Sequence, residues 1–454
     1  MTNVKDTSFS PKSVREIAVK ILNRIEISGA YPEKLLDLEL QTNVLNKKDK
    51  ALLYEIIHGV IRNLIQLDWV LSEFYNGKFK NLPKDVKNIM RVALYQLLFL
   101  DKVPAYAVVN EAVKLAKTKK GKRISQIING VLRNVLRNKN NIKYPDKKEN
   151  YVKFLSVYYS HPIWLVERWL ALYGKKFTEG LLSANNRKPK LSIRVNGLVT
   201  NIEEMKKILT ENGYSFTQAE YLPDYINLNS FSNISDWEYF KKGYFSIQDE
   251  STGFSCYLLN PKPGEKVLDL FSAPGGKTGL LANLMKNQGE IVAVDKYAGR
   301  LKTLKKNMER LAVTNVTVVE ADALKFNPAE KFDKILLDAP CSGLGTLTKK
   351  PDIKWKRDIE DIHKLSKLQI NLLEKGASLL KPGGELVFST CTIEPEENFE
   401  TIKKFLINHP EFELVNASNY FNKKLIAENG CLQTYPNIHG IDGAFAAKLK
   451  LNDE

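Results

Sequence analysis

The sequence predicts a multidomain protein: an all-helical N-terminal bundle at 1–145, a small α/β domain at 150–240, and a C-terminal doubly wound, mostly parallel sheet at 241–454 that ends in an antiparallel strand. Two patterns predict this fold class. Apolar side chains recur at helical spacing in the first part, and short apolar runs alternate with helical segments in the last. The length of 454 residues agrees, because one domain usually holds ~100–200 residues.

The composition is that of an ordinary globular protein, with 43% apolar and 26% charged residues, which argues against wholesale disorder. The 68 lysine and arginine residues exceed the 52 acidic ones and give a formal net charge of +16. Such an excess is typical of proteins that bind a polyanion, because basic side chains displace counterions from phosphates. It is also compatible with general solubility, so the charge favours a nucleic acid partner without requiring one.

Cysteines and apolar runs indicate the cellular setting. The four cysteines include no pair with metal-type CxxC spacing and are too few for a disulfide framework, and the five histidines lack ligand spacing. The first residues, MTNVKDTSFS, lack the apolar core of a signal peptide, and no run of ~18 apolar residues could span a membrane. We therefore expect a reduced, cytoplasmic protein, monomeric, without a metal and without membrane contact.

The first part reads as a series of amphipathic helices. Apolar residues recur every three or four positions in five segments: Ile17, Ile21 and Ile25; Leu53, Ile57, Val60, Ile61 and Leu64; Ile89, Ala93 and Leu97; Val109, Ala112, Val113 and Ala116; and Ile128, Val131, Leu132 and Val135. Pro83 and Pro104 precede two of these segments, where proline is tolerated at a helix start. An all-helical bundle accounts for this pattern.

Basic residues gather near the end of this part. One connection holds five of them and the following helical face holds two: Lys117, Lys119, Lys120, Lys122, Arg123, Arg133 and Arg137. A basic loop beside a basic helical face suits RNA phosphates. A basic loop that is merely solvated is an equally good interpretation of the same residues.

The middle part begins after a polar stretch at 138–150 that resembles a linker. A short helical segment around Trp164 and Trp169 comes first. A strand is expected at Leu191–Val195, a helix after Asn201, which is a good N-cap, and more strand within Tyr221–Asn229. We expect a small α/β domain at 150–240 that contributes to RNA binding.

The last part alternates buried strands with helices. Apolar runs occur at Val267–Leu270, Ile291–Val294, Val316–Val319, Ile335–Leu337 and Leu386–Phe388, and a final strand at Phe445–Leu451 follows the Asp442-Gly443 turn. Parallel strands that are buried on both faces have this continuous apolar character. The pattern therefore predicts a doubly wound sheet with a ligand site at the carboxyl ends of its strands.

A glycine turn after the first of these strands is the strongest cofactor signal. A phosphate-binding loop needs glycine where Phe271 stands, and the dinucleotide fingerprint GxGxxG is absent. S-adenosylmethionine fits better, because Asp295 after the second strand can accept both ribose hydroxyls and Asp322 after the third can reach the adenine amino group. The candidate cofactor residues are Phe271, Ser272, Ala273, Pro274, Gly275, Gly276, Lys277, Asp295, Arg300, Asp322 and Asp338.

Two cysteines, Cys341 and Cys391, follow the fourth and fifth strands, at the edge where the cofactor is expected. Each alone is more often a small buried residue than a nucleophile. A thiolate that adds to carbon 6 of cytosine turns the ring into an enamine, and carbon 5 can then attack an activated methyl group. Asp338 can hydrogen-bond the cytosine edge and stabilise a proton on ring nitrogen 3. These considerations leave open which thiol attacks.

The catalytic part resembles the RNA cytosine carbon-5 methyltransferases of the NOL1/NOP2/Sun family. The matching segments, in order, are 245–251, the turn at 271–278, Pro340-Cys341, Pro351 to Trp355, Thr390-Cys391, Glu396 to Asn398 and Asp442-Gly443. The resemblance implies that Cys391 is the nucleophile and that Cys341 helps to release the product. Ala444 departs from the family pattern, which has a bulky aromatic residue there, so local packing is in doubt.

The helical part resembles the RNA-binding antitermination factor NusB, through residues 105–116 and 127–137. A NusB-like domain ahead of this catalytic domain is the arrangement of bacterial 16S ribosomal RNA members of the family. The resemblance therefore implies a 16S ribosomal RNA substrate. Two alternatives remain: the same chemistry on transfer RNA, and a NusB-like binding or assembly factor with an inactive catalytic domain. The presence of both thiols, Asp338 and the glycine turn disfavours the second.

Overall fold

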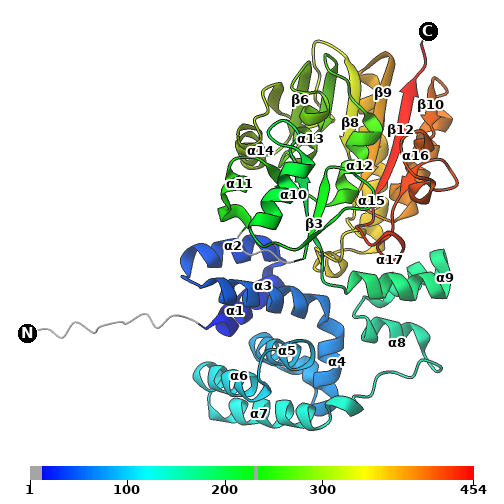
Figure 1. Cartoon of the computed structure of the whole chain (residues 1–454). Coiled ribbons are helices and arrows are strands. Elements are labelled where there is room, and N and C mark those ends of the chain that lie inside the picture. The colour runs from blue at the N-terminus through cyan, green and yellow to red at the C-terminus, as the bar shows by residue number, and fades with distance from the viewer. Residues whose placement is uncertain (1–12, 230–233, 454) are drawn as a thin grey trace, which may run out of the picture. The chain divides into compact units, whose positions relative to one another are not determined.

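The computed structural model describes residues 13–229 and 234–453, which fold into two compact units (Figure 1). The first unit comprises Met1–Asn186 together with Lys354–Lys356, and the second comprises Arg187–Ile353 with Arg357–Glu454. No helix within the described residues combines the length and apolar character of a membrane span. The N-terminal segment in which we predicted no signal-peptide core lies outside the described residues.

The first unit is all-helical, as predicted. Its α-helices are α1 (Val14–Ser28), α2 (Pro32–Thr42), α3 (Lys47–Arg62), α4 (Leu64–Phe74), α5 (Lys84–Phe99), α6 (Ala105–Lys120), α7 (Lys122–Arg137), α8 (Tyr151–Tyr158) and α9 (Ile163–Asn185). Helix α5 is the centre, because it packs against α1, α3, α4, α6 and α7 and is buried on nearly every side. Pro83 and Pro104 are the N-cap residues of α5 and α6, where no backbone donor is lost. Lys354 joins this unit by donating to the carbonyl of Arg62 (2.9 Å).

The second unit begins with a small antiparallel sheet in the order β2-β3-β1-β4. Its elements are β1 (Leu191–Val195), α10 (Ile202–Glu211), β2 (Phe216–Gln218), β3 (Tyr225–Leu228), α11 (Glu238–Lys241) and β4 (Phe245–Ile247). Asn201 caps α10 as predicted, accepting from the amide of Glu204 (2.9 Å). The predicted small α/β fold is confirmed. Helices α8 and α9, which we grouped with it, belong to the first unit.

The large sheet of the second unit has the order β10-β12-β9-β8-β5-β6-β7, with β11 paired to β12. Its strands are β5 (Lys266–Leu270), β6 (Glu290–Asp295), β7 (Val316–Glu320), β8 (Phe332–Asp338), β9 (Leu380–Thr390), β10 (Phe412–Val415), β11 (Leu432–Gln433) and β12 (Phe445–Leu451). Strands β5 to β9 pair in parallel, and β12 pairs antiparallel with β9. The predicted mostly parallel sheet with a final antiparallel strand is therefore confirmed.

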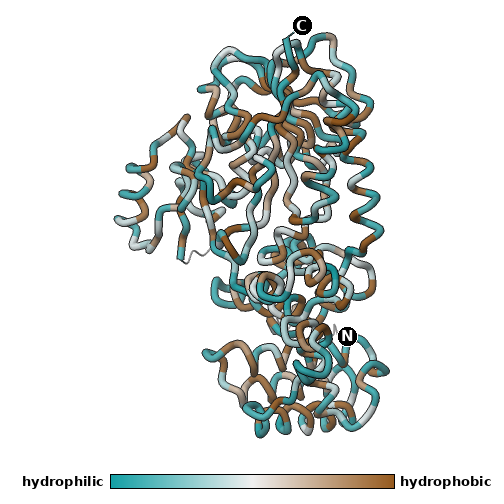
Figure 2. Tube along the Cα trace, turned by 90° about the vertical axis from the view of Figure 1, so that its right-hand side faces the viewer, coloured by the Kyte–Doolittle hydropathy of each residue, from teal (hydrophilic) through white to brown (hydrophobic). Residues whose placement is uncertain are grey.

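Helices cover both faces of this sheet, which explains why its strands are apolar throughout. They are α12 (Glu250–Leu259), α13 (Gly276–Leu284), α14 (Ala298–Arg310), α15 (Ile359–Ser378) and α16 (Phe399–Asn408). Leu268 and Leu337 pack in one core with α15 and α16, whereas Val267 and Leu336 pack in another with α12 and α13. Figure 2 shows these strands in brown at the centre of the unit. Polar residues at the strand ends are therefore available for a site.

Candidate active site

The predicted glycine turn connects β5 to α13 at the carboxyl edge of the sheet. Phe271 and Gly275 have positive φ angles of 65° and 101°, and such a conformation costs glycine little. A β-carbon on Gly275 would lie 2.9 Å from Cε of Met308, so the end of that side chain would have to shift, and the positive φ would strain any other residue there. The amide of Ser272 donates to the carbonyl of Val294 on β6 (3.0 Å). The turn is thereby fixed to the neighbouring strand, with its backbone open at the edge.

Asp295 ends β6 and is almost fully buried, at 2% exposure. Arg300 Nη1 lies 3.1 Å from its Oδ2, and Arg300 Nη2 donates to the carbonyl of Ala273 in the glycine turn. The amide of Tyr297 donates to Oδ1 of Asp295 (3.0 Å). Arg300 therefore ties together two segments that the sequence assigned separately to a cofactor.

Asp322 follows β7 at the same edge and is partly exposed. Lys296 Nζ lies 2.9 Å from its Oδ2, and the amide of Leu324 donates to Oδ1 (3.1 Å). The hydrogen bond from Lys296 lowers the pKa of Asp322, so this carboxylate is ionised at neutral pH. An ionised acceptor at this position suits an exocyclic amino group.

These residues fit S-adenosylmethionine by their donor and acceptor chemistry. The cofactor presents two ribose hydroxyls and an α-ammonium group, which need acceptors, and an α-carboxylate, which needs donors such as backbone amides. Asp295 and Asp322 are carboxylates at adjacent strand ends, and the bare backbone at Gly275 allows close approach. Asp269, within β5, adds a buried Oδ1 atom that has no hydrogen-bond partner among the described residues. The edge is thus rich in acceptors.

The two candidate thiols meet at the ends of neighbouring parallel strands. Strands β8 and β9 are in register at Asp338 and Ser389, so the residues that follow each strand come together. Cys341 Sγ lies 3.1 Å from Cys391 Sγ, and the amide of Cys391 also donates to Cys341 Sγ (3.3 Å). The structure therefore brings both predicted cysteines into one pair.

The surroundings give the two thiols opposite tendencies to ionise. The hydrogen bond between them lowers the pKa of Cys391 and raises that of Cys341 well above its usual value. The positive charges of Lys350 and Lys277 also favour the Cys391 thiolate, while the negative charge of Asp338 opposes it. These surroundings favour ionisation of Cys391 over ionisation of Cys341, and a thiolate is the form in which cysteine is nucleophilic.

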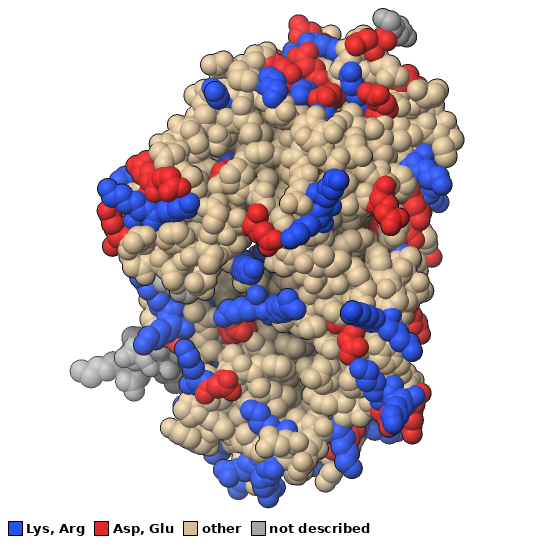
Figure 3. Space-filling model, turned by 45° about the vertical axis from the view of Figure 1, so that its right-hand side comes forward, with Lys and Arg blue, Asp and Glu red and all other residues tan. Residues whose placement is uncertain are grey.

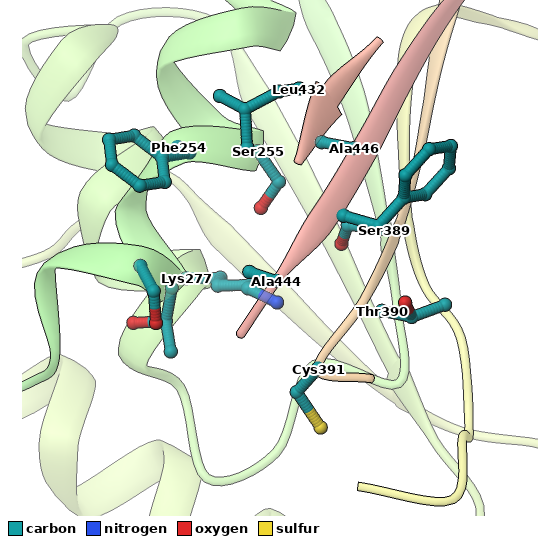
Figure 4. Close-up of a pocket in the computed structure, with 12 residues that line it drawn as sticks. Phe254, Ser255, Lys277, Ser389, Thr390, Cys391, Leu432, Ala444 and Ala446 are labelled. Carbon is teal, nitrogen blue, oxygen red and sulfur yellow. The ribbon is translucent and has the colours of Figure 1, made fainter. Parts of the chain in front are cut away.

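Lys277, in the first turn of α13, lies between the glycine turn and the two cysteines that follow β8 and β9. Its ammonium pairs with Oδ1 of Asp338, which also accepts from Oγ of Ser389 (3.0 Å). Figure 4 shows Lys277 reaching across a pocket towards Ala444, with Cys391 at its lower rim. The full lining is Ser251, Thr252, Phe254, Ser255, Lys277, Ser389, Thr390, Cys391, Leu432, Ala444, Phe445 and Ala446. The sequence had suggested Lys277 only as a cofactor residue and had not linked it to Asp338.

Backbone hydrogen bonds hold the loop that carries Cys391. The amide of Gly345 donates to the Cys391 carbonyl (3.1 Å), and the amide of Gly443 donates to the Gly345 carbonyl (2.8 Å). A β-carbon on Gly345 would lie 2.2 Å from the Gly443 carbonyl oxygen, so the two loops need glycine to approach this closely. Three segments far apart in the sequence thus hold the loop that contains Cys391.

A partly exposed lysine, Lys349, connects two of the motifs that carried the family resemblance. Lys349 pairs with Asp249, which caps α12, and with Asp442 (3.0 Å) of the Asp-Gly turn. Thr348 Oγ1 also donates to Asp442 (2.7 Å). Sequence reasoning missed Lys349, because a single lysine in a basic chain carries no signal until its two carboxylate partners are known.

The predicted RNA-binding residues lie at the ends of α6 and along α7, and all seven are exposed. Lys119 pairs with Glu16 (2.9 Å) and Lys120 with Asp85 (2.5 Å), so part of their charge is compensated. Arg133 donates to Asn129 (2.9 Å). Figure 3 shows that basic and acidic side chains are interspersed over the surface it presents. In the part of the chain that the structure describes, no cluster of His, Cys, Asp and Glu could hold a metal ion.

Comparison with known proteins gives a consistent family. Residues 256–450 match the model described as 16S rRNA methyltransferase RsmB/F, residues 12–137 match the NusB family, and residues 161–235 match the RsmF/B-like ferredoxin-like domain. The probable ribosomal RNA small subunit methyltransferase B of Bacillus subtilis is 35% identical over 444 residues, covering 96% of this chain and 98% of that protein. Its counterpart in Synechocystis is 36% identical over 447 residues, covering 96% and 99%.

A solved structure extends the similarity to the whole fold. The crystal structure of the protein PH0851 has a TM-score of 0.80 and 31% sequence identity, and it covers 98% of this chain and 100% of its own. The helical domain, the small sheet and the methyltransferase sheet are therefore found together in known proteins. On the matched domains and on the full-length relatives, the chain belongs to the RsmB/F family of 16S rRNA methyltransferases.

Proposed function

We propose that this chain transfers a methyl group from S-adenosylmethionine to carbon 5 of a cytosine in 16S ribosomal RNA, through a covalent bond between Cys391 and the base. The observation that carries the proposal is the thiol pair, with Cys341 Sγ 3.1 Å from Cys391 Sγ, beside the Lys277–Asp338 ion pair. A methyltransferase that modified an oxygen or an amine would need neither thiol. Carbon 5 of cytosine requires one, because it is a poor nucleophile until the ring is activated.

The cofactor supplies a methyl group on a positively charged sulfur. Asp295 and Asp322 would hold its ribose and adenine, and the turn around Gly275 would hold its amino-acid end. Arg300 positions Asp295 and the turn together through its contacts with both. Asp295, Asp322 and the turn lie at the same edge of the sheet as the two thiols, so a cofactor held there would lie beside them.

The first chemical step is addition of Cys391 to the base. The thiolate sulfur forms a bond to carbon 6, and the displaced π electrons make carbon 5 nucleophilic. Asp338 hydrogen-bonds the cytosine edge and stabilises a proton on ring nitrogen 3, which offsets the charge developing in the ring. Lys277 holds Asp338 in place, and its charge also stabilises the thiolate before attack.

The last step restores the base after carbon 5 has gained the methyl group. The carbon-5 proton leaves to water or a nearby thiol. Its bonding electrons re-form the double bond between carbons 5 and 6 as the carbon 6–sulfur bond breaks, and that bond's electron pair leaves with Cys391 as a thiolate. Cys341, within hydrogen-bond distance of that sulfur, assists its departure. The two thiols thereby divide attack and release between them.

The substrate assignment is supported by the relatives, which are named as small-subunit ribosomal RNA methyltransferases. The match extends over nearly the whole length of these relatives. The NusB-like domain and the exposed basic residues on α6 and α7 add a surface suited to RNA phosphates. We also predict that the protein is a monomer, that it works in the cytoplasm, and that its substrate is free or assembling ribosomal RNA.

Substitution of each thiol tests the chemistry. We expect Cys391→Ala to abolish methylation of 16S ribosomal RNA by labelled S-adenosylmethionine, because no sulfur remains to activate the ring. Cys341→Ala should instead accumulate a covalent protein–RNA adduct, visible on a denaturing gel, because release is impaired. An adduct that persists in Cys391→Ala and is missing in Cys341→Ala would reverse the assignment.

Bisulfite sequencing tests the substrate separately. Ribosomal and transfer RNA from a strain that lacks the gene should differ from wild type at a cytosine of 16S ribosomal RNA. A lost mark in transfer RNA would move the same chemistry to that substrate. A catalytically inactive binding factor would leave both RNAs unchanged.

A further inference from the structure

A buried carboxylate lies against the turn that carries Cys341. Glu397 belongs to the short helix η5 (Pro395–Glu397) and is fully buried. Its Oε2 atom accepts from the amide of Ser342 (2.7 Å) and from Nε2 of Gln369 (3.1 Å). The same Gln369 nitrogen donates to the carbonyl of Pro340 (2.8 Å). Glu397 and Gln369 therefore hydrogen-bond to the backbone of the residues on both sides of Cys341, Ser342 and Pro340.

The second carboxylate oxygen of Glu397 is left without compensation. Oε1 is buried and has no hydrogen-bond partner among the described residues. Burial raises the pKa of Glu397 to about 7, because the charged form loses solvation that only one oxygen recovers. An amide could accept the same two hydrogen bonds without this desolvation cost. Above pH 7 the position therefore carries a negative charge that the two hydrogen bonds alone do not require.

The thiol pair supplies a reason for the charge. The amide of Cys391 points at Cys341 Sγ (3.3 Å), and by itself this donor would favour a thiolate on Cys341. The negative charge of Glu397 opposes ionisation of Cys341. Around Cys391 Sγ, Lys277 and Lys350 are positive and Asp338 is negative. Near Glu397, the other carboxylate is that of Glu394 in the same loop.

We propose that Glu397 is a positioning residue that keeps the proton of the thiol pair on Cys341, so that Cys391 is the thiolate that attacks the base. Two groups act on Cys341 Sγ in opposite directions. The Cys391 amide, which donates to this sulfur, favours its ionisation, and the Glu397 carboxylate, which accepts from the neighbouring Ser342 amide, opposes it. This inference rests on the proposed role of Cys391 as nucleophile. It adds the residue that selects one sulfur over the other.

Alkylation of the full-length protein without RNA tests this inference independently of methyl transfer. The protein is treated briefly with iodoacetamide, and the alkylated fractions of Cys391 and Cys341 are compared by peptide mass spectrometry. In wild type at pH 8 we expect Cys391 to react first. In Glu397→Gln the ratio of Cys391 to Cys341 alkylation should fall about tenfold, the change that corresponds to one pKa unit.

The wild-type protein provides a second test that needs no substitution. Glu397 becomes neutral as the pH falls through about 7, so the alkylation ratio should decline over that range in wild type. The ratio should be flat over the same range in Glu397→Gln. In this variant the plateau of the kcat/KM profile for methylation should fall and its acidic limb should move to lower pH, because loss of the negative charge eases ionisation of Cys341. A merely structural role would not shift the limb.

Glu396→Gln is the matched control, because it makes the same change one residue away on the same short helix. It should leave the alkylation ratio unchanged. An unchanged ratio in Glu397→Gln, or a wild-type ratio independent of pH, would overturn the inference while leaving the proposed methylation standing. If the ratio responds as expected but Cys391→Ala still methylates, the proposed function fails and the proton placement stands.

Discussion

The four cysteines of this chain show how much a side chain depends on its immediate contacts. Cys256 and Cys431 are buried among apolar residues, and burial raises the pKa of each thiol to about 12. Cys341 and Cys391 share a hydrogen bond, and their pKa values move in opposite directions. Strand-end position in the sequence singled out the second pair. It could not rank the two, because the ranking depends on charges brought in from other segments.

Glu397 illustrates the same limit at a single residue. The sequence placed it in a family motif but gave no contact for it, since its partners Ser342 and Gln369 lie far away in the chain. Lys277 is similar: its place in the glycine turn was predicted, but the direction of its side chain towards Asp338 was not. Residue identity near a strand end can be predicted from sequence, whereas the partner across the site cannot.

Asp269 provides a prediction about stability and pH. It is fully buried in β5, where Thr278 Oγ1 donates to Oδ2 (2.6 Å) and burial raises its pKa from 3.8 to about 7. The unfolded chain releases this proton near pH 4 and the folded chain near pH 7. The residue therefore lowers the free energy of unfolding as the pH rises between these values, by up to about 4 kcal/mol.

Asp269→Asn removes this titration while keeping an oxygen for Thr278. Relative to wild type, the variant should become more stable as the pH rises from 4 to 7, and the difference should level off above 7. Urea unfolding of both proteins at a series of pH values measures the difference. Parallel curves across the whole range would show that Asp269 does not carry the buried proton.

The elements of the catalytic sheet were largely predictable because buried parallel strands are apolar on both faces. Runs such as Ile335–Leu337 and Leu386–Phe388 lie within β8 and β9, and the strand after Asp442-Gly443 has the bounds predicted for it. The short strands β10 and β11 were missed. Two residues in β11, Leu432 and Gln433, form no pattern, and their pairing with β12 depends on the sheet already being present.

The glycine turn gives a prediction at the scale of an element. Gly275→Ala must adopt a φ near 101° and place a β-carbon 2.9 Å from Met308 Cε. We expect a loss of about 1–3 kcal/mol in stability and at least tenfold weaker binding of S-adenosylmethionine, measured by thermal melting and calorimetry. The reason is that the strained residue lies in the turn that we propose holds the amino-acid end of the cofactor.

Gly299→Ala is the control for that prediction. Gly299 lies in α14, and a β-carbon there would meet no atom within 4 Å. This variant should keep cofactor affinity and gain up to about 1 kcal/mol of stability, because alanine favours helix more than glycine does. Equal losses in the two variants would mean that the turn does not depend on its left-handed glycine.

At the scale of the whole molecule, the net charge of +16 is spread over two units of different kinds. The order of a helical domain, a small sheet and a methyltransferase sheet was predictable, because each has its own apolar period. The placement of Lys354–Lys356 in the helical unit was not, since these residues stand between segments of the second unit. A three-residue segment that packs with another unit does not change the local pattern of apolar residues, so the sequence pattern cannot reveal it.

The predicted RNA surface is best tested at residues whose charge is not already compensated. Lys122 is exposed at the start of α7, and no ion pair involves it within residues 13–229 and 234–453. Lys122→Glu should weaken binding to 16S ribosomal RNA several-fold and reduce the slope of log affinity against log salt by about one, because one phosphate contact is lost. Filter binding over a series of salt concentrations measures both.

Lys331→Glu is the matched control, because this exposed lysine precedes β8 at the opposite edge of the sheet from the thiols. Its reversal changes the net charge equally and should leave the salt slope unchanged. Identical losses in the two variants would indicate a general effect of net charge rather than a surface on α7.

The glycine contact that holds the Cys391 loop also has a consequence for the order in which a newly made chain can assemble its site. The ribosome synthesises Cys391 before Gly443, whose amide completes the link through Gly345 to the Cys391 carbonyl. A chain interrupted before Gly443 would therefore contain both cysteines, Asp338 and Lys277, but would lack the hydrogen bond that holds the Cys391 loop through Gly345. The contact that holds Cys391 can form only after almost the whole catalytic sheet has been synthesised.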